Sequence, residues 1–412
     1  MNQYRDIIGK FNYGLFLAIV ALLPFDQLLL RYAFVTWFVC WLLEGRWLNR
    51  PKPIRDNRML IPFLLFGLWY LWRIVSWFWA ADHAIWSWQT ERYLTFGLIV
   101  PVAVWGVNKH YDWRVAGKVL VGSCVAAVPV YIAIMTFFYY HPEWIGKLHL
   151  GGEWKAISGW FGYFEENISF LKHRLFLCSV ELFGVAIAYK LWRKRPAILL
   201  PALIVMLSSI PLTGSRQSVL TAAGLIAVTM VYELPGRYRL RYGIGILLVG
   251  IVLGFGVLNL HPRMQNFDYT DLTEIREVSS NHNARLNIWG VALQQPSDYL
   301  AHGLGAGQST PYMIEKYKEA KFGYYANKQY NAHNQYLEEL MEIGLPGLLL
   351  FILAWVSIPL CARRQGILTA LLFTTIFMMN MLTDCMFGRF CGIALWAVGL
   401  LMIVLQSEAH SD

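Results

Sequence analysis

The chain has 412 residues, of which 57% are hydrophobic and only 15% are charged. Soluble domains carry about 25% charged residues, so this composition excludes an ordinary soluble protein and indicates a polytopic membrane protein. The formal net charge of +9 could suggest nucleic-acid binding. Basic cytoplasmic loops of a membrane protein account for it better, and we expect no nucleic-acid partner.

Twelve apolar stretches follow one another along the chain, each long enough or nearly long enough to cross a bilayer as a helix. They lie at approximately residues 12–25, 27–43, 59–80, 93–107, 115–139, 170–190, 197–212, 217–233, 240–260, 335–360, 366–384 and 388–406. Arg5 and Lys10 precede the first stretch as they would in a signal peptide, but no small-residue cleavage site follows. The sequence therefore predicts an all-α polytopic membrane protein with about 12 transmembrane helices, the first of them retained.

The basic residues are concentrated in every second connection between the spans. If the N-terminus is cytoplasmic, the cytoplasmic connections include EGRWLNRPKPIRDNR, KLWRKRP, LPGRYRLRYG and CARRQG. The short connections on the other side hold at most one basic residue each. Because cytoplasmic loops collect Lys and Arg, this asymmetry predicts that both termini are cytoplasmic.

Two longer segments, residues 140–169 and 261–334, then fall on the outer side of the membrane. We divide the chain into residues 1–260, with nine helices and short loops, residues 261–334, the larger outer loop region, and residues 335–412, with three helices and a tail. The loop region is too small for an enzyme domain of ordinary size. We expect the function to lie where this region meets the helix ends.

Motifs for metal or nucleotide chemistry are absent from the sequence. It contains no DxD, no HExxH, no Cys/His ligand cluster and no P-loop, and none of its six cysteines has CxxC spacing. We therefore expect no metal, no cofactor, no disulfide framework and no reaction driven by ATP.

The stretch AHNQYLEELMEIGLPG, which begins at residue 332, places a histidine at the start of an apolar span. Counted as one helix from His333, the residues Leu337, Leu340, Gly344 and Gly347 share its face. The histidine should then face the bundle, and the glycines should let another helix approach closely. His333 is either an interfacial residue at a helix end or a general base, since histidine titrates near neutral pH.

Three glutamates, Glu338, Glu339 and Glu342, lie off this stripe in the first turns of the same span. Carboxylates there suit the positive end of the helix dipole, which is our interpretation of them. Pro346 should loosen the helix near its glycines.

The stretch LTGSRQSVL, residues 212–220, places Arg216 at the outer junction of two spans, opposite to the side on which basic residues gather. Its guanidinium could reach lipid headgroups as a snorkelling side chain. It could also clamp an anion, because guanidinium binds phosphate bidentately and the adjoining helix start adds backbone donors.

The outer loop region contains NARLNIWG and, further on, HGLGAG. Arg285 opens a predicted helix that ends before Pro296, and on its own it would be read as a solvated surface charge. The glycine-rich run at 303–307 does not follow a strand in a βαβ unit, so we reject a nucleotide-binding loop and predict a tight turn.

Other ionisable residues interrupt the apolar runs: Asp26, Arg73, Glu181 and Asp384. Such residues usually face the bundle interior or a polar cavity. Asp384 lies at the outer end of its span near Arg389, where an ion pair and a site role are both open. Glu181 lies in the middle of a span and could be a protonated packing residue.

Across these stretches the sequence resembles the O-antigen ligase family of bacterial inner-membrane glycosyltransferases. The matching residues are TGSR around Arg216, NARLNIWG and HGLGAG around Arg285, and AHNQYLEELMEIGLPG from His333, with a leucine four residues on and two glycines three apart. The length, the number of spans and the large outer loop before the last spans also fit.

The resemblance implies a GT-C-like fold in the bacterial inner membrane with the active site on the periplasmic face. It implies transfer of an O-antigen glycan from undecaprenyl pyrophosphate to lipid A–core, with membrane lipids around the protein. Arg216 and Arg285 match the family's essential arginines, which would bind the donor pyrophosphate, and His333 matches its essential histidine. Asp384 is expected to support them, as are Asn334 and Arg389.

Three alternatives remain at this point. An O-antigen polymerase and a protein O-oligosaccharyltransferase use the same donor and share parts of the histidine-to-glycine motif. The second usually carries an extra C-terminal region, whereas this sequence ends at Asp412, soon after its last span. A secondary transporter, with Asp26, Arg73 and Glu181 along its pathway, is disfavoured because we find no internal repeat.

Overall fold

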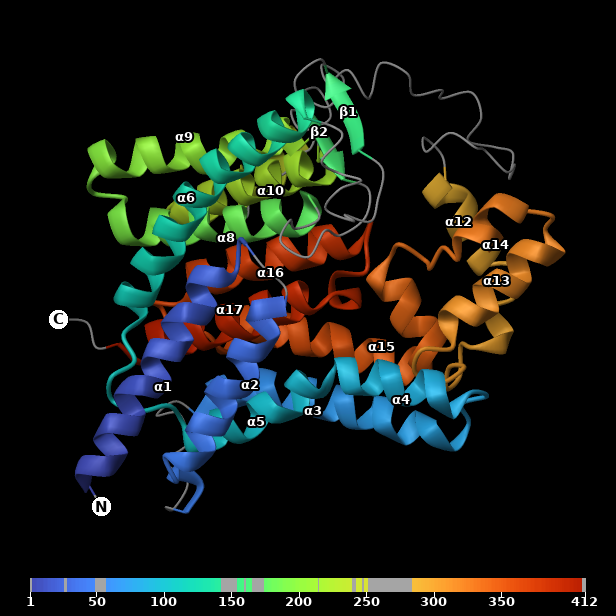
Figure 1. Ribbon diagram of the computed structural model, residues 1–412, viewed down its shortest axis with the longest axis horizontal. Helices are drawn as coiled ribbons and strands as arrows, with labels where there is room; N and C mark the ends of the chain where they lie inside the picture. The colour runs from blue at the N-terminus through green and yellow to red at the C-terminus, as the bar shows by residue number, and fades with distance from the viewer. Residues whose placement is uncertain are drawn as a thin grey trace.

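The computed structural model describes residues 2–25, 28–48, 57–141, 154–158, 161–164, 174–213, 215–238, 242–246, 248–250 and 284–409. Within them the chain is overwhelmingly helical, as predicted (Figure 1). The long helices are α1 (Asn2–Leu22), α2 (Leu28–Leu43), α3 (Leu60–Val75), α5 (Leu94–Trp105), α6 (Trp113–Tyr140), α8 (Arg174–Trp192), α9 (Pro196–Thr213), α10 (Arg216–Glu233), α15 (Gln335–Cys361), α16 (Ile367–Met381) and α17 (Phe390–Glu408).

The smaller elements connect these helices. They are the helices α4 (His83–Arg92), α12 (Ala284–Ala292), α13 (Ser309–Glu319) and α14 (Gly323–Lys328), the 3₁₀ turns η1 (Arg46–Leu48), η2 (Asn57–Met59), η3 (Ser76–Phe78), η4 (Pro296–Asp298) and η5 (Met386–Gly388), and the strands β1 (Trp154–Ser158) and β2 (Phe161–Phe164). The two strands pair antiparallel, with an irregular register between Ala156 and Ser158. This hairpin, in the connection between α6 and α8, adds a small strand element to the helical architecture.

The predicted spans correspond to helices wherever the structure describes them in full. By length and composition, six helical segments can cross a membrane: Leu60–Phe78, Trp113–Ile134, Arg174–Trp192, Pro196–Thr213, Gln335–Cys361 and Phe390–Glu408. Helices α2 and α16 are apolar but shorter. The predicted span at 240–260 lies mostly outside the described residues. The protein is thus a helical, polytopic membrane protein, with α1 beginning earlier than the apolar pattern predicts because its first turns are polar.

The helices surround a buried centre rather than forming a single layer. The apolar window of α17 is 89% buried and that of α8 is 72% buried, whereas that of α9 is only 22% buried. Figure 1 shows both chain ends at one end of the bundle and α12, α13 and α14 at the other. The bundle therefore has two chemically distinct ends joined by its apolar helices.

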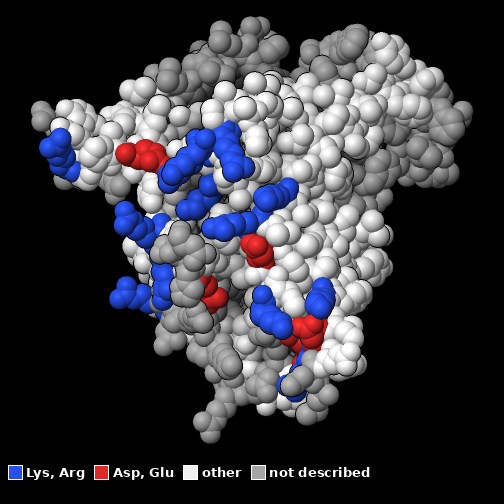
Figure 2. Space-filling view, turned by 90° about the vertical axis from the view of Figure 1, so that its left-hand side faces the viewer, with Lys and Arg blue, Asp and Glu red and all other residues white. Residues whose placement is uncertain are grey.

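The end that carries the chain termini is basic. Figure 2 looks at this end and shows Lys and Arg gathered there with few acidic residues among them. The connection between α8 and α9 contributes exposed Arg193, Lys194 and Arg195, and the connection after α15 contributes exposed Arg363 and Arg364. This distribution is the one expected of cytoplasmic loops.

An aromatic cluster fills the core where α3, α5, α15 and α17 meet. The ring of Phe387 in η5 lies 4.8 Å from that of Phe96 and 6.1 Å from that of Trp355, and the Phe96 and Trp396 rings are 4.1 Å apart. Such ring pairs stabilise by about 0.5–1.5 kcal/mol each beyond their burial. The cluster holds η5 against the second half of α15, and this fixes the loop that carries Asp384.

A second, smaller core lies among α12, α13, α14 and the start of α15. Ile288 of α12, Met313 and Tyr317 of α13 and Tyr325 of α14 are buried together, and Met341 of α15 joins them. Helices α12, α13 and α14 therefore pack on one another and on the first turns of α15.

Candidate active site

His333 does not belong to a helix. Its φ is 46°, in the left-handed region, and α15 begins only at Gln335 with Asn334 as its N-cap. The Asn334 side chain accepts the N–H of Leu337, and the Asn331 side chain accepts the N–H of His333 at 3.1 Å. The predicted helical stripe headed by His333 is therefore wrong, because two asparagine side chains hold a turn where a continuous helix was assumed.

The imidazole of His333 faces a carboxylate instead. Its Nδ1 lies 3.8 Å from Oδ1 of Asp384, in the segment between α16 and η5, and the two side chains are 33% and 20% exposed. This nitrogen is buried and has no hydrogen-bond partner among the described residues. The distance exceeds that of a hydrogen bond but lies within ion-pair range, so a small movement would join the two groups. Asp384 can thus orient the imidazole ring.

Glu338 ties the segments of both residues together. Its carboxylate accepts the backbone N–H of Ala332 at 3.4 Å, and the Sγ of Cys385 lies 3.9 Å from the same oxygen. Ala332 precedes His333, and Cys385 follows Asp384. The other oxygen of Glu338 accepts the hydroxyl of Ser309 at 2.5 Å. One buried side chain therefore positions both halves of the His333–Asp384 pair.

The other two glutamates of α15 pair with Arg73 of α3. Glu339 accepts a hydrogen bond from Arg73 Nη1 at 2.8 Å, and Glu342 pairs with Nη2. Trp69 Nε1 also donates to Glu339, at 2.9 Å, and the arginine and both glutamates are at most 1% exposed. The interpretation that these glutamates interact with the helix dipole is therefore wrong, because they form a buried ion-pair network with Arg73. The sequence suggested only that Arg73 faces the bundle interior.

The glycine-rich run forms a tight turn against the middle of α15, as predicted. Gly303, Gly305 and Gly307 all have positive φ values, and the N–H groups of residues 304 and 305 donate to the carbonyls of residues 341 and 342 at 2.8 Å. Helix α15 is broken at Gly344, which has a φ of 68°. The kink near Pro346 is confirmed. The segment that approaches Gly344 is a loop, with the backbone of His302 and Gly303 closest to it, and not the helix we expected.

Each of the two predicted arginines lies on a segment that is hydrogen-bonded near His333. Arg216 is the first residue of α10 and is half-buried, and its neighbour Gln217 donates to the carbonyl of Met379 near the end of α16 at 2.5 Å. The neighbouring carbonyl of Met378 accepts the hydroxyl of Tyr336 at 3.1 Å. Tyr336 lies three residues after His333. Arg216 and His333 therefore lie at the same end of the bundle.

Arg285 lies in the first turn of α12 and is exposed. One turn later, Trp289 Nε1 donates to the carbonyl of Ala332 at 2.9 Å. This bond links the helix of Arg285 to the residue before His333. Within the described residues, no hydrogen bond joins the His333 imidazole to the guanidinium of Arg216 or of Arg285. The structure thus brings the three segments together at one end of the bundle.

Arg389 is the N-cap residue of α17, five residues after Asp384. Its Nη1 is buried without a hydrogen-bond partner in the described part of the chain, and its guanidinium lies 5.9 Å from the ring centre of Phe176. It also lines the pocket described below, together with Arg31 and Arg92. The sequence did not indicate Arg31 and Arg92 as site residues, because each lies near a helix end, where basic residues are common.

The described residues contain no group of three or more His, Cys, Asp or Glu side chains placed to hold a metal ion. Glu181 is buried in α8, as predicted, and neither of its carboxyl oxygens has a hydrogen-bond partner within the described ranges. Asp26 lies outside the described residues. Glu181 and Arg73 are both buried in the helix bundle.

A comparison with known protein families matches residues 201–352 to the family described as O-antigen ligase. The matched stretch runs from α9 into α15, so it includes Arg216, Arg285 and His333 and ends before Asp384. A comparison with curated protein sequences finds no match to the chain.

Proposed function

We propose that this chain is an O-antigen ligase, because its residues 201–352 match the family described by that name. Its donor is a glycan on undecaprenyl pyrophosphate, and its acceptor is a sugar hydroxyl of lipid A–core. One observation carries the proposal. A half-buried imidazole faces a carboxylate at one end of the bundle. Helices α10 and α12, which carry Arg216 and Arg285 in their first turns, are hydrogen-bonded to the same neighbourhood.

The reaction is a single displacement. The acceptor oxygen attacks the anomeric carbon of the donor sugar, and the bond between that carbon and the pyrophosphate oxygen breaks. Configuration at the anomeric carbon inverts. The leaving pyrophosphate departs with the bonding electron pair, so the charge on it grows in the transition state and must be neutralised.

His333 takes the proton of the attacking hydroxyl. With Nδ1 directed at Asp384, the imidazole presents Nε2 as its basic nitrogen, and the carboxylate stabilises the imidazolium that forms. A general base of this kind contributes roughly 10²–10⁴-fold to the rate. Asn334, as N-cap, fixes the backbone from which the ring extends.

Arg216 and Arg285 bind the donor pyrophosphate. Each guanidinium offers a bidentate set of donors, and preorganised donors typically contribute about 3–4 kcal/mol each to transition-state stabilisation. Arg216 also stands at the start of α10, where backbone N–H groups and the helix dipole favour an anion. We propose that the two arginines supply the charge neutralisation without a metal ion.

The placement in the cell follows the same reasoning. We propose about 12 transmembrane helices in a GT-C-like arrangement within the bacterial inner membrane. Both termini and the basic loops would lie in the cytoplasm, and the segment 261–334 would form the periplasmic region between the helices of 1–260 and those of 335–412. The basic end in Figure 2 supports this orientation, because cytoplasmic loops collect Lys and Arg.

The test is a transfer assay on purified protein with both lipid substrates. His333→Ala should lose transfer by roughly 10²-fold or more while retaining donor binding. Arg216→Ala should weaken donor binding itself. His83→Ala, which changes an exposed histidine at the start of α4, is the matched control and should transfer normally. If His333→Ala ligates at near the wild-type rate, the base assignment is wrong.

Two further results would change the proposal. Added EDTA should have no effect, and a strong loss of activity would overturn the metal-free mechanism. Cells lacking a ligase should accumulate long glycans on undecaprenyl pyrophosphate. Single repeat units on lipid A–core would instead identify the protein as a polymerase that uses the same donor.

A further inference from the structure

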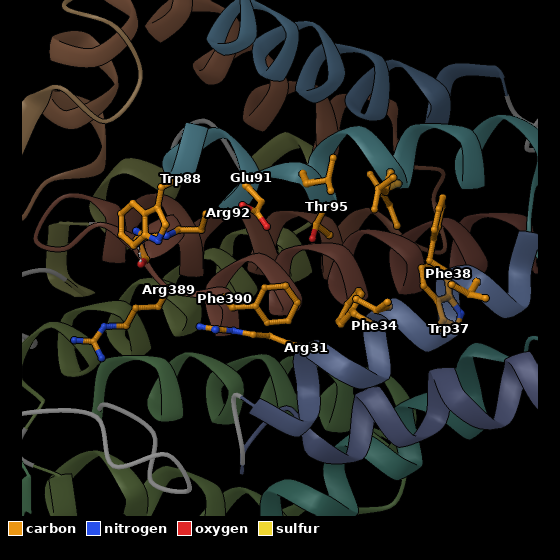
Figure 3. A pocket seen from close by; sticks show the side chains of 16 residues that line it. Arg31, Phe34, Trp37, Phe38, Trp88, Glu91, Arg92, Thr95, Arg389 and Phe390 are labelled. Atoms are coloured by element: carbon orange, nitrogen blue, oxygen red, sulfur yellow. Dashed lines mark hydrogen bonds between the residues drawn. The ribbon is translucent and has the colours of Figure 1, made fainter. Parts of the chain in front are cut away.

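A pocket of about 820 Å³ lies between α2, α5 and the start of α17 (Figure 3). Three arginines line it: Arg31 in the first turn of α2, Arg92 at the end of α4 and Arg389 before α17. Neither Arg216 nor Arg285 lines it. The pocket is therefore separate from the arginines to which we assign the donor pyrophosphate.

The pocket has one charged end and one apolar end. In Figure 3 the three arginines lie together with Trp88 and Phe390, whereas Phe34 and Phe38 extend away from them along α2. Leu94 and Leu98 of α5 continue the apolar lining. A charged head in contact with the arginines would thus be followed by a hydrocarbon chain along the two helices.

The arginines keep donors available for a ligand. Arg389 Nη1 is buried without a hydrogen-bond partner in the described chain. Arg92 is stacked on the Trp88 ring, 3.7 Å from its centre, and donates one hydrogen bond, to the carbonyl of Gly388 at 3.0 Å. Arg31 contacts the ring of Phe390 from 5.8 Å. The stacked rings hold the guanidinium groups in place and leave other N–H groups free to bind oxygens.

The charge of the lining selects among phosphate groups. Three arginines and Glu91 give a formal charge of 3 − 1 = +2. A phosphate monoester carries about −1.5 to −2 at neutral pH, whereas the phosphodiester of an ordinary phospholipid carries about −1. The pocket therefore matches a terminal phosphate better than a phosphodiester.

The charged end of the pocket lies near the start of α15, as His333 does. Its Gly388 belongs to η5, and the neighbouring Phe387 N–H donates to the Gln335 side chain at the start of α15 at 3.0 Å. A lipid whose head contacts these arginines would therefore place the groups attached to that head close to the His333–Asp384 pair.

We propose that this pocket binds a lipid that carries a phosphate monoester, with the phosphate between Arg31, Arg92 and Arg389 and a hydrocarbon chain along α2 and α5. The identity of that lipid rests on the proposed function. With the donor pyrophosphate at Arg216 and Arg285, the lipid in this pocket is the acceptor glycolipid.

The binding test uses detergent-purified protein titrated with phosphatidic acid, a monoester, and with phosphatidylglycerol, a diester, by microscale thermophoresis. Phosphatidic acid should bind more tightly, and Arg31→Gln should weaken its binding about tenfold or more. Arg31 is exposed and its contact is a ring face, so this variant should fold. The control is Arg193→Gln, an exposed arginine paired with Glu233 at the opposite end.

Equal binding of the two lipids, or wild-type binding of phosphatidic acid by Arg31→Gln, would overturn the site. The assignment to the acceptor has a separate measurement, since Arg31→Gln should raise the KM for the acceptor and leave the KM for the donor unchanged. An unchanged acceptor KM in a variant that no longer binds phosphatidic acid refutes that assignment alone. Absence of any transfer by the wild type, with selective lipid binding intact, refutes the proposed function and leaves the site standing.

Discussion

Replacing Gly344 by alanine should disrupt the backbone contact between the glycine-rich turn and α15. A Cβ at this position would lie 2.6 Å from the carbonyl carbon of His302 and 2.7 Å from the nitrogen of Gly303. Both are backbone atoms, so they cannot rotate away. The next residue, Leu345, donates its N–H to the carbonyl of Leu300 at 2.8 Å, so the two chains cannot separate without losing that bond.

The size of the effect follows from two terms. An alanine held in the left-handed region at a φ of 68° costs about 1–2 kcal/mol. Forcing an extra carbon into closely packed backbone costs about 1–3 kcal/mol more. We therefore expect the free energy of unfolding to fall by about 2–5 kcal/mol.

Intrinsic tryptophan fluorescence during SDS titration of the purified protein measures this change. Gly122→Ala is the matched control, because a Cβ at this position in α6 meets nothing within 4 Å. Its backbone is helical, so the control should be neutral or more stable by about 0.5–1 kcal/mol. Transfer activity should also fall in Gly344→Ala, because the displaced turn leads to Ser309, which bonds Glu338.

The reasoning fails if Gly344→Ala unfolds at the same SDS concentration as Gly122→Ala. Such a result would mean that α15 continues through this position as an ordinary helix. The glycine would then serve only close packing, as the sequence pattern alone suggested.

Three further substitutions test other contacts. Arg73→Met leaves two carboxylates buried without their cation, so unfolding in SDS should become easier by about 3–5 kcal/mol; an unchanged midpoint would show that the pair is not formed. Trp289→Phe removes the hydrogen bond to Ala332, so it should slow transfer and lower the free energy of unfolding by about 1 kcal/mol. An unaltered transfer rate would show that the position of α12 does not affect catalysis. Burial and the carboxylate of Asp298 raise the pKa of Tyr312, so its neutral form stabilises the fold below pH 10. Tyr312→Phe should therefore destabilise at pH 7, and its deficit should shrink as the pH rises above 10; a deficit independent of pH would refute the hydrogen bond.

The sequence by itself determined the class of protein and the positions of its helices. The apolar character of a segment is a local property, so the six helices long enough to cross a membrane could be located from composition alone. The turn at 303–307 and the break near Pro346 were also predictable, because glycine and proline act on their own backbone. The candidate residues Arg216, Arg285 and His333 came from motifs in the order typical of a family.

Only the tertiary structure decided what these residues face. The bond between Arg73 and Glu339 joins positions 266 residues apart, and no periodicity in either segment specifies that pairing. His333 lies before the helix and not within it, because the side chains of Asn331 and Asn334 accept backbone N–H groups there. The pocket of Arg31, Arg92 and Arg389 arises because three helix ends, distant in the chain, are packed around one aromatic core. Local patterns fix which segments are buried, whereas long-range packing selects the partner of each buried charge.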